Sequence, residues 1–237
     1  MRLSAPIYRL KRQAKRLSRD GNIALVTALD QIAAAEGFST WSMLAAQAAR
    51  ITPAQKIFAR LSPGDLMLLG ARPGHGKTLL GLELAVAAMK RGHRSMFFTL
   101  EYIERDVHDR FRDLGVDLNR FAQLFGFDAS DDISSDYITT QLSSAARGTL
   151  AVIDYLQLLD QRRDKPALTT QIRTLHAFAR ERGLIFVFIS QIDRTYDPAV
   201  KSCPDLGDVR MPNALDVTLF AKACFLHDGE IRFQSVN

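Results

Sequence analysis

Ala71-Arg72-Pro73-Gly74-His75-Gly76-Lys77-Thr78 stands between an apolar run and a segment whose apolar residues recur at helical spacing. Gly74 and Gly76 allow backbone N–H groups to curl around phosphate oxygens, and a helix N-terminus adds partial positive charge. The pattern is that of a Walker A loop in which Ala71 replaces the usual first glycine, with Gly70 just before it. A chance glycine-rich turn is the alternative, but the flanking strand and helix favour a phosphate-binding loop.

This loop is the expected nucleotide site. Lys77 should reach the β- and γ-phosphates, and the Thr78 hydroxyl should ligate magnesium. ATP and Mg2+ are therefore the expected cofactors. The residues expected at the nucleotide are Ala71, Arg72, Pro73, Gly74, His75, Gly76, Lys77, Thr78 and Leu79.

Short β-rich apolar runs recur along the chain, separated by segments long enough for helices. Such runs lack polar alternation because parallel strands covered on both faces are buried on both sides. Their order predicts an α/β fold with a mainly parallel sheet flanked by helices. The expected strands are residues 66–69, 95–100, 150–153, 184–189 and 217–220, followed by a hairpin of residues 223–226 and 230–233 that turns at Asp228-Gly229.

Three polar side chains follow these strands, where the carboxyl ends of a parallel sheet form a ligand crevice. Asp154 is the expected Walker B carboxylate in the magnesium shell; taken alone, it would be an ordinary turn or cap residue. Glu101 is the candidate base for the attacking water, with a solvated strand-end glutamate as the alternative. Gln191 carries an amide that can contact the γ-phosphate and report its loss. The candidate catalytic residues are therefore Lys77, Glu101 and Gln191, and the candidate metal ligands are Thr78 and Asp154.

The N-terminal segment has a helical pattern that runs from Pro6 until Gly37 interrupts it. A short third helix follows, with Ser39 as its expected N-cap. We expect a small helical module over residues 1–50 and the phosphate-binding domain over residues 51–237. The apolar positions that would hold the module together are Leu10, Ala14, Leu17, Leu25, Leu29, Ile32, Phe38, Trp41 and Leu44.

The composition limits the chain to one good core and a small satellite, because 237 residues with 47% apolar side chains do not supply two full domains. The sequence has no apolar run near the roughly 18 residues that span a bilayer, and the basic N-terminus does not resemble a signal peptide. Cys203 and Cys224 form no CxxC pattern and predict neither a disulfide framework nor a zinc site. We expect a cytoplasmic protein without a membrane partner.

The net charge of +5 is concentrated at one end of the chain. Residues 1–19 contain seven basic side chains and no acidic one, which leaves 24 basic against 26 acidic residues in the rest. The basicity therefore belongs to an N-terminal arm and not to the core.

Four segments, in this order and spacing, resemble successive motifs of the DnaB-type replicative helicases. The similarity covers roughly Leu61 to Phe220, and the Asp-Tyr-Leu-Gln element is its most selective part. The resemblance implies a RecA-like P-loop NTPase in which Lys77 and Thr78 bind nucleotide and magnesium, Glu101 is the catalytic carboxylate, Asp154 serves the metal and Gln191 senses the γ-phosphate. The matching segments are Ala71–Thr78, Phe98-Thr99-Leu100-Glu101, Ile153-Asp154-Tyr155-Leu156-Gln157-Leu158 and Ser190-Gln191-Ile192-Asp193-Arg194.

The sequence departs from this family at both ends. DnaB-type enzymes usually carry a collar domain and a linker helix that help to close a hexameric ring, and residues 1–50 resemble neither. Family members also place an arginine finger near the last strands. Lys222 and Arg232 are the basic residues left there, and each is alternatively an ordinary hairpin surface residue. Without a finger, ATP turnover would be slow or would need a partner ATPase.

The resemblance also implies that the loops after the Walker B strand and after the Ser-Gln strand face single-stranded DNA. Their basic residues can follow a phosphate backbone, and so can those on one face of the first helix. Solvated loops and a solvated helix face are the alternatives. The candidates are Arg162, Arg163, Lys165, Arg194, Lys201, Arg210, Arg9, Arg12, Arg16 and Arg19.

Two functions compete on this basis. The first is an ATP-hydrolysing DnaB-like protein that acts on single-stranded DNA as a homo-oligomer such as a hexamer. The second is a stand-alone RecA-like module in which nucleotide controls assembly or partner docking without unwinding. A third, weaker hypothesis treats the N-terminal arm as a tail that docks the ATPase on DNA or on another protein.

Overall fold

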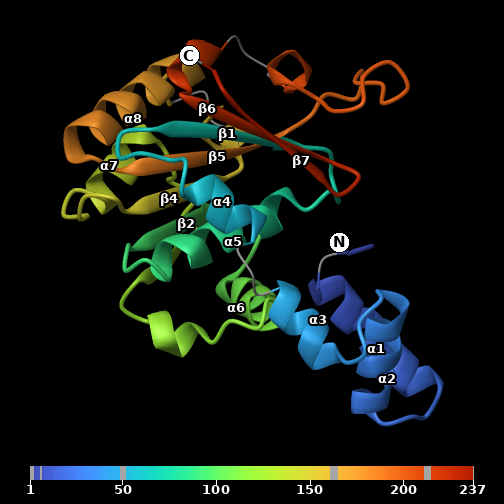
Figure 1. Cartoon of the computed structure of the whole chain (residues 1–237). Helices are drawn as coiled ribbons and strands as arrows, with labels where there is room; N and C mark the ends of the chain where they lie inside the picture. Colours follow the sequence, from blue (N-terminus) through green and yellow to red (C-terminus); the bar gives the residue numbers. More distant parts are fainter. Residues whose placement is uncertain (1–2, 6, 49–51, 161–164, 211–214, 237) are drawn as a thin grey trace.

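The computed structural model describes residues 3–5, 7–48, 52–160, 165–210 and 215–236 (Figure 1). Helices and strands alternate over most of the chain, as expected for a βαβ architecture. The helices are α1 (Ile7–Asp20), α2 (Leu25–Ala35), α3 (Trp41–Ala48), α4 (Pro53–Phe58), α5 (Lys77–Met89), α6 (Glu104–Asp113), α7 (Ser135–Gln141) and α8 (Leu168–Arg182). The strands are β1 (Leu66–Ala71), β2 (Ser95–Thr99), β3 (Phe125–Asp128), β4 (Leu150–Asp154), β5 (Ile185–Gln191), β6 (Lys222–His227) and β7 (Glu230–Ser235).

The strands form one sheet in the order β3-β2-β4-β5-β1-β6-β7, in which only the β6–β7 pair is antiparallel. The register aligns Ala71 with Gln191 and Leu226, and it aligns Asp154 with Thr99. The carboxyl ends of the six parallel strands that the structure describes therefore meet at one edge of the sheet. The expectation of a mainly parallel sheet flanked by helices is confirmed.

Two apolar layers cover the two faces of the sheet. Alternate strand residues such as Met67 and Leu69 pack with α4, α5 and α6. Their neighbours Leu66 and Leu68 pack with α7 and α8 on the other face. This double burial explains why the strands read as continuous apolar runs in the sequence.

Helix α5 lies very close to the sheet, and Gly81 permits this approach. A Cβ at Gly81 would stand 2.8 Å from Ile189 Cδ1 and 3.2 Å from Val152 Cγ1. Because both contacts are tighter than normal, a larger residue would push the helix away. The close packing fixes the first turn of α5, where Lys77 and Thr78 lie, relative to the strand ends.

Helices α1, α2 and α3 lie together beside the rest of the chain (Figure 1). They share a small apolar cluster of their own, built on Leu10, Ala33 and Leu44. The predicted helices are present, but two details differ. The α3 cap is Thr40, whose Oγ1 accepts a hydrogen bond from the Met43 N–H at 3.3 Å, whereas the predicted cap Ser39 contacts the Met43 sulfur. Leu25 is 41% exposed, and the buried residues of α2 are Ala28 and Ala33.

The predicted strand at residues 217–220 was wrong. Val217–Leu219 forms a single 3-10 turn capped by Asp216, whose side chain accepts from the Thr218 N–H. Phe220 is fully buried, but the strand that pairs with β1 begins only at Lys222. Two elements were not predicted: α4, which begins with a Thr52/Gln55 capping box, and the short strand β3. Across the described ranges, no helix is long and apolar enough to cross a bilayer.

Candidate nucleotide site

The loop between β1 and α5 has the backbone of a phosphate cradle. Gly74 has φ 80° and Gly76, the N-cap of α5, has φ 88°. Both angles lie in the left-handed region that glycine adopts without strain. A Cβ at either glycine would have no heavy atom within 4 Å, so backbone conformation and not crowding selects glycine here. The loop opens toward free space in front of the helix N-terminus, where backbone N–H groups favour an anion.

Lys77, Thr78 and Asp154 come together at the base of this loop. All three are buried, and Asp154 is fully inaccessible. Burial raises the pKa of Asp154 to about 6, while the Thr78 hydroxyl and the Lys77 charge oppose this rise. The structure therefore brings the predicted metal ligands and the predicted phosphate-binding lysine to one place.

The Asp154 carboxylate fits a cation site. Both of its oxygens are buried and accept no hydrogen bond of normal geometry from any residue that the structure describes, although Thr78 is near enough to lower the pKa. Leaving such a group without a partner is costly, since buried carboxylates are normally paired or bound to metal. Mg2+ prefers oxygen ligands, and the Thr78 hydroxyl and Asp154 carboxylate supply them.

Glu101 lies two residues beyond the end of β2, on the same sheet edge. Its backbone N–H donates to Thr99 Oγ1 at 3.0 Å, and Thr99 pairs with Asp154 in the sheet. The Glu101 side chain is exposed and near enough to Asp154 for its charge to raise the pKa of that carboxyl. Glu101 is thus an accessible carboxylate beside the cradle.

Gln191 ends β5 beside Ala71, and a polar network holds the segment around it. The Arg210 N–H donates to the Gln191 carbonyl at 2.8 Å, and Arg210 Nη1 lies 3.5 Å from Gln191 Oε1. Gln157 Nε2 donates to Ser190 Oγ at 3.1 Å and to the Arg210 carbonyl at 2.8 Å. The segment after β4 is therefore hydrogen-bonded to the end of β5.

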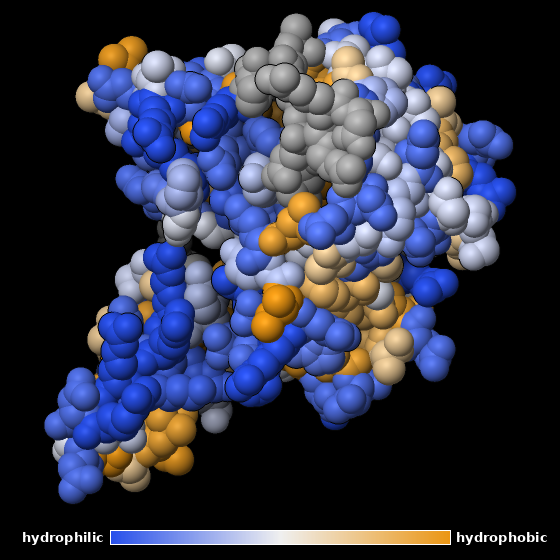
Figure 2. Space-filling view, turned by 180° about the vertical axis from the view of Figure 1, so that it is seen from behind, coloured by the Kyte–Doolittle hydropathy of each residue, from blue (hydrophilic) through white to orange (hydrophobic). Residues whose placement is uncertain are grey.

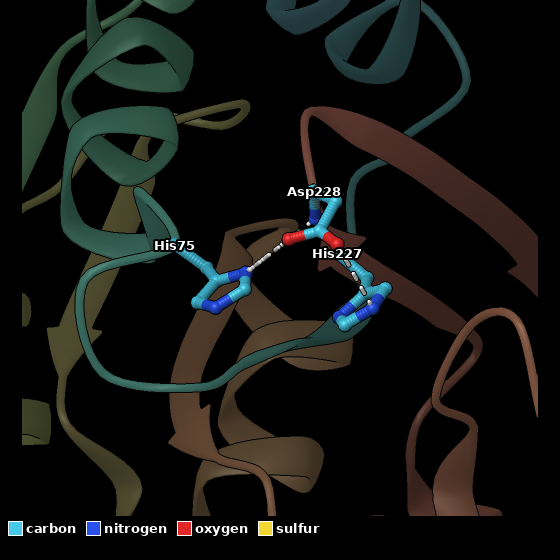
Figure 3. A group of neighbouring side chains, drawn as sticks. All are labelled: His75, His227 and Asp228. Carbon is cyan, nitrogen blue, oxygen red and sulfur yellow. Dashed lines mark hydrogen bonds and ion pairs between the residues drawn. The ribbon is translucent and has the colours of Figure 1, made fainter. Parts of the chain in front are cut away.

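Two side chains of the loop point away from the cradle. Arg72 donates to the Tyr196 carbonyl and lies 5.1 Å from the Tyr196 ring centroid. His75 stacks on His227 with ring centroids 5.4 Å apart, and its Nδ1 lies 3.9 Å from Asp228 Oδ1 (Figure 3). These side chains join the loop to the segment after β5 and to the β6–β7 hairpin.

The candidate DNA residues fall into three groups. Arg9, Arg12, Arg16 and Arg19 are exposed on α1, and Figure 2 shows the largely hydrophilic surface of this arm. Arg194 is exposed as well. Arg162 and Arg163 lie outside the described residues.

The remaining three are engaged within the protein. Lys201 lies 2.5 Å from Asp205 and 2.6 Å from Asp208, and these carboxylates raise its pKa. Lys165 Nζ donates to the Ile133 carbonyl at 2.8 Å. Arg210 faces Gln191, as described above. The side chains of Lys201 and Lys165 are therefore less available to a phosphate backbone than the loop sequence suggested.

The finger candidates both lie on the hairpin. Lys222 Nζ donates to Ser235 Oγ at 3.2 Å, and Lys222 is at the amino end of the parallel strands, away from the cradle. Arg232 is exposed on β7 opposite Phe225. Their surroundings are those of hairpin surface residues.

The fold and this cradle define the chain as a P-loop ATPase of the RecA-like class. The model of the family described as "ATPase: KaiC" matches residues 50–202, and the chain belongs to that family.

The chain is also similar to replicative DNA helicases. It is 25% identical to the DnaB of Mycoplasma genitalium in an alignment 189 positions long that covers 65% of this chain and 40% of that protein. It is 28% identical to the DnaB of Pasteurella multocida in an alignment 194 positions long that covers 67% of this chain and 41% of the relative. The chain thus spans less than half the length of these relatives.

Solved structures give the same fold. A KaiC-like protein of Pyrococcus horikoshii superposes with a TM-score of 0.52 at 18% identity, over 68% of this chain and 70% of that one. A DnaB-like replicative helicase, described together with its interactions with primase, gives a TM-score of 0.60 at 17% identity over 92% and 66% of the two chains. The predicted DnaB resemblance and RecA-like fold are confirmed.

Residues that the sequence analysis had not placed at the site are Gln157, His227 and Asp228. Gln157 belongs to the Asp-Tyr-Leu-Gln element, so a signal was present in the motif itself. The hairpin turn carried no such signal, because its position beside the loop depends on the pairing of β6 with β1.

Proposed function

We propose that the chain binds and hydrolyses ATP with magnesium and acts on single-stranded DNA as a DnaB-like protein. The observation that carries the proposal is the convergence of Lys77, Thr78, Asp154 and Glu101 at one sheet edge, where the buried Asp154 oxygens accept no hydrogen bond of normal geometry from the described residues. Membership in an ATPase family and similarity to DnaB helicases support it.

Each residue has a distinct task in this proposal. The loop N–H groups and the Lys77 ammonium hold the phosphates, and the Thr78 hydroxyl and Asp154 carboxylate would hold Mg2+. Held there, Mg2+ would supply positive charge to the phosphoryl group that is transferred. Glu101 orients the attacking water and accepts its proton as the γ-phosphate separates from ADP. Gln191 contacts the γ-phosphate, and the network of Gln157 and Arg210 carries its loss to neighbouring segments.

DNA binding is proposed for the arm formed by α1, with Arg194 as a further contact. The exposed guanidinium groups of Arg9, Arg12 and Arg16 favour this surface over Lys201 and Lys165, which are engaged within the chain. We propose that residues 1–50 form a separate helical module and residues 51–237 the ATPase domain, since α1 to α3 share their own apolar cluster. A homo-oligomer, for which a hexamer is one arrangement, would place nucleotide between subunits.

The experiment is ATP turnover with and without single-stranded DNA at low salt. We expect DNA to raise turnover, and we expect Lys77→Ala to reduce turnover by about 10²–10³-fold, since it removes a charged group from the transition state. Lys90→Ala, an exposed lysine at the other end of α5, is the matched control and should retain the wild-type rate. Turnover that is indifferent to DNA would contradict the DNA-acting function.

The second candidate is a nucleotide-dependent regulatory module without unwinding activity. The hairpin surroundings of Lys222 and Arg232 favour it, because neither residue has the features of a finger. This candidate predicts a nucleotide-linked change in oligomeric state. Sedimentation that is identical in the apo, ADP and ATP-analogue forms would count against it.

A further inference from the structure

Three metal-ligating side chains meet between the loop after β1 and the turn of the β6–β7 hairpin (Figure 3). His75, His227 and Asp228 each offer a ligand atom, and these atoms all lie within 4.8 Å of one another. Asp228 is central, with one carboxylate oxygen 3.9 Å from His75 Nδ1 and the other 3.5 Å from His227 Nε2. The nucleotide chemistry described above uses none of these three side chains.

The fold brings the cluster together from segments far apart in the sequence. Strand β6 pairs with β1 so that Leu226 stands beside Ala71, which puts His227 next to the loop that follows β1. Asp228 and Gly229 have φ 43° and 77°, as a tight two-residue hairpin turn requires. The turn therefore places the backbone of Asp228 beside His75.

The ring contacts anchor one side of the cluster. His227 is buried, stacks on His75 and meets the Tyr196 ring edge-on at 5.5 Å. The side chains of His75 and Asp228 are 26% and 77% exposed, so both can adjust and solvent can reach them. One fixed imidazole with two adjustable ligands suits a site that closes around an ion.

The donor set selects the kind of ion. Two imidazole nitrogens and one carboxylate oxygen favour late first-row transition metals, whereas Mg2+ prefers oxygen ligands. Zn2+ commonly takes three protein ligands and keeps a fourth position for water. The cluster is thus chemically distinct from the oxygen ligands Thr78 and Asp154.

The distances are compatible with such a site after a small closure. Tetrahedral zinc with bonds of about 2.0–2.1 Å holds its ligand atoms roughly 3.3–3.4 Å apart. The separations of 3.5 and 3.9 Å run to different oxygens of Asp228, and the three ligand atoms lie within 4.8 Å of one another. The widest pair must therefore close by up to about 1.4 Å, which the exposed side chains of His75 and Asp228 allow. The His75 ring must also rotate, because two parallel rings cannot both direct a nitrogen at one ion in their planes.

We propose that His75, His227 and Asp228 bind one divalent transition-metal ion of the zinc type, which joins the phosphate-binding loop to the hairpin turn. His75 lies between the two glycines of the loop, so a bound ion restrains the segment that must accommodate phosphate. Metal binding at this cluster can be measured independently of ATP turnover.

The test is titration of the untagged, chelator-treated full chain with Co2+, followed by visible absorption, and with Zn2+, followed by calorimetry. We expect about one ion per chain and little competition from Mg2+. His227→Ala and Asp228→Asn should each weaken metal binding by more than about 10-fold. Loss of a residue that only supports a metal ligand already costs about that much, and these two residues would be ligands themselves. Asp228→Asn keeps the shape of the side chain and tolerates the positive φ, so its folding is not in question.

The matched control is His108→Ala. His108 lies 3.8 Å from Glu104 one turn away on an exposed helix, which is the kind of pair that binds metal adventitiously. The proposal holds if His108→Ala retains the wild-type affinity while the cluster variants lose it. The proposed site would be refuted if His108→Ala removed metal binding while Asp228→Asn left it unchanged. It would also be refuted if the wild type bound no ion stoichiometrically.

Discussion

Asp154 is a buried carboxylate that accepts no hydrogen bond of normal geometry within the part of the chain that the structure describes. A folded core rarely contains such a group, because loss of hydration is not compensated. Here the cost is tolerated at the place where Thr78 and Lys77 also converge. The arrangement is typical of a site in which function opposes stability.

Asp154→Asn should therefore stabilise the protein in the absence of Mg2+ and nucleotide. The folded-state pKa is raised from 3.8 to about 6, mainly by burial. The stability that this group contributes is present below pH 4 and is lost as the pH rises through about 6. At pH 7 the loss amounts to about 3 kcal/mol, so we expect the neutral amide to recover about 1–3 kcal/mol.

Urea unfolding of both proteins at several pH values checks this prediction. The advantage of Asp154→Asn should shrink as the pH falls from 7 toward 4, where the wild-type carboxyl becomes neutral. A variant that is less stable than the wild type at pH 7, or a difference that does not change with pH, would refute the assignment of a strained carboxylate.

At the scale of elements, the position of α5 on the sheet decides where Lys77 and Thr78 lie. Gly81 is the point of closest approach, with Ile189 and Val152 directly beneath it. Glycine has no side chain, so Gly81 makes no side-chain contact of its own. Its role is to leave room for the helix.

Gly81→Val should lower the free energy of unfolding by about 1–3 kcal/mol through overpacking. It should also weaken nucleotide binding, because α5 must move away from the strand ends. The control is Ala46→Val, which introduces the same side chain at an exposed position of α3 and should cost at most about 0.7 kcal/mol. Equal effects of the two substitutions in thermal unfolding would show that helix propensity, and not packing against the sheet, governs α5.

The elements also show how far the sequence predicted the fold. Strands β1, β2, β4 and β5 were predicted because both faces of the sheet are covered there, which leaves continuous apolar runs. The hairpin was predicted from its Asp228-Gly229 turn, since β7 itself is largely exposed. The four-residue strand β3 was missed, since all its residues are only partly buried. Residues 217–220 were wrongly predicted as a strand because the run is apolar. Phe220 is buried by packing, but the run forms a 3-10 turn and does not pair in the sheet.

The sequence predicted those residues of the site that belong to motifs at the ends of strands. Glu101, Asp154 and Gln191 all stand at the edge that holds the Walker A loop, because parallel strands share their carboxyl ends. The contacts of His75 with the hairpin turn could not be predicted. They join residues about 150 positions apart and depend on the order of β1 and β6 in the sheet.

At the scale of the whole molecule, charge and chemistry are divided between two parts. The nucleotide residues lie on the sheet edge, whereas the densest positive charge lies on the exposed face of α1. Binding to a nucleic acid backbone depends on such charges and weakens as salt rises.

Replacing Arg9, Arg12 and Arg16 together by alanine should reduce the salt dependence of single-stranded DNA binding. Each phosphate contact contributes about 0.7 to the slope of log affinity against log salt, so we expect the slope to fall by about 2. Fluorescence anisotropy with a labelled oligonucleotide at several salt concentrations measures it.

The control removes the same charge from exposed positions of the core, with Lys90, Arg105 and Arg120 changed to alanine. This variant should lower the slope by less than the arm variant. A slope that falls equally in both variants would indicate that only net charge matters and that the arm is not the DNA surface.

The most direct test of the account is ATP turnover by the wild type and by Glu101→Gln, measured with Mg2+ and single-stranded DNA, with nucleotide binding followed on the same preparations. The substitution keeps the size of the exposed side chain and removes the carboxylate that accepts the proton of water. We predict that both proteins bind ATP equally well and that turnover falls by about 10²–10⁴-fold in the variant. Turnover in Glu101→Gln that equals the wild-type rate, or a wild type that binds ATP without hydrolysing it, would contradict the account.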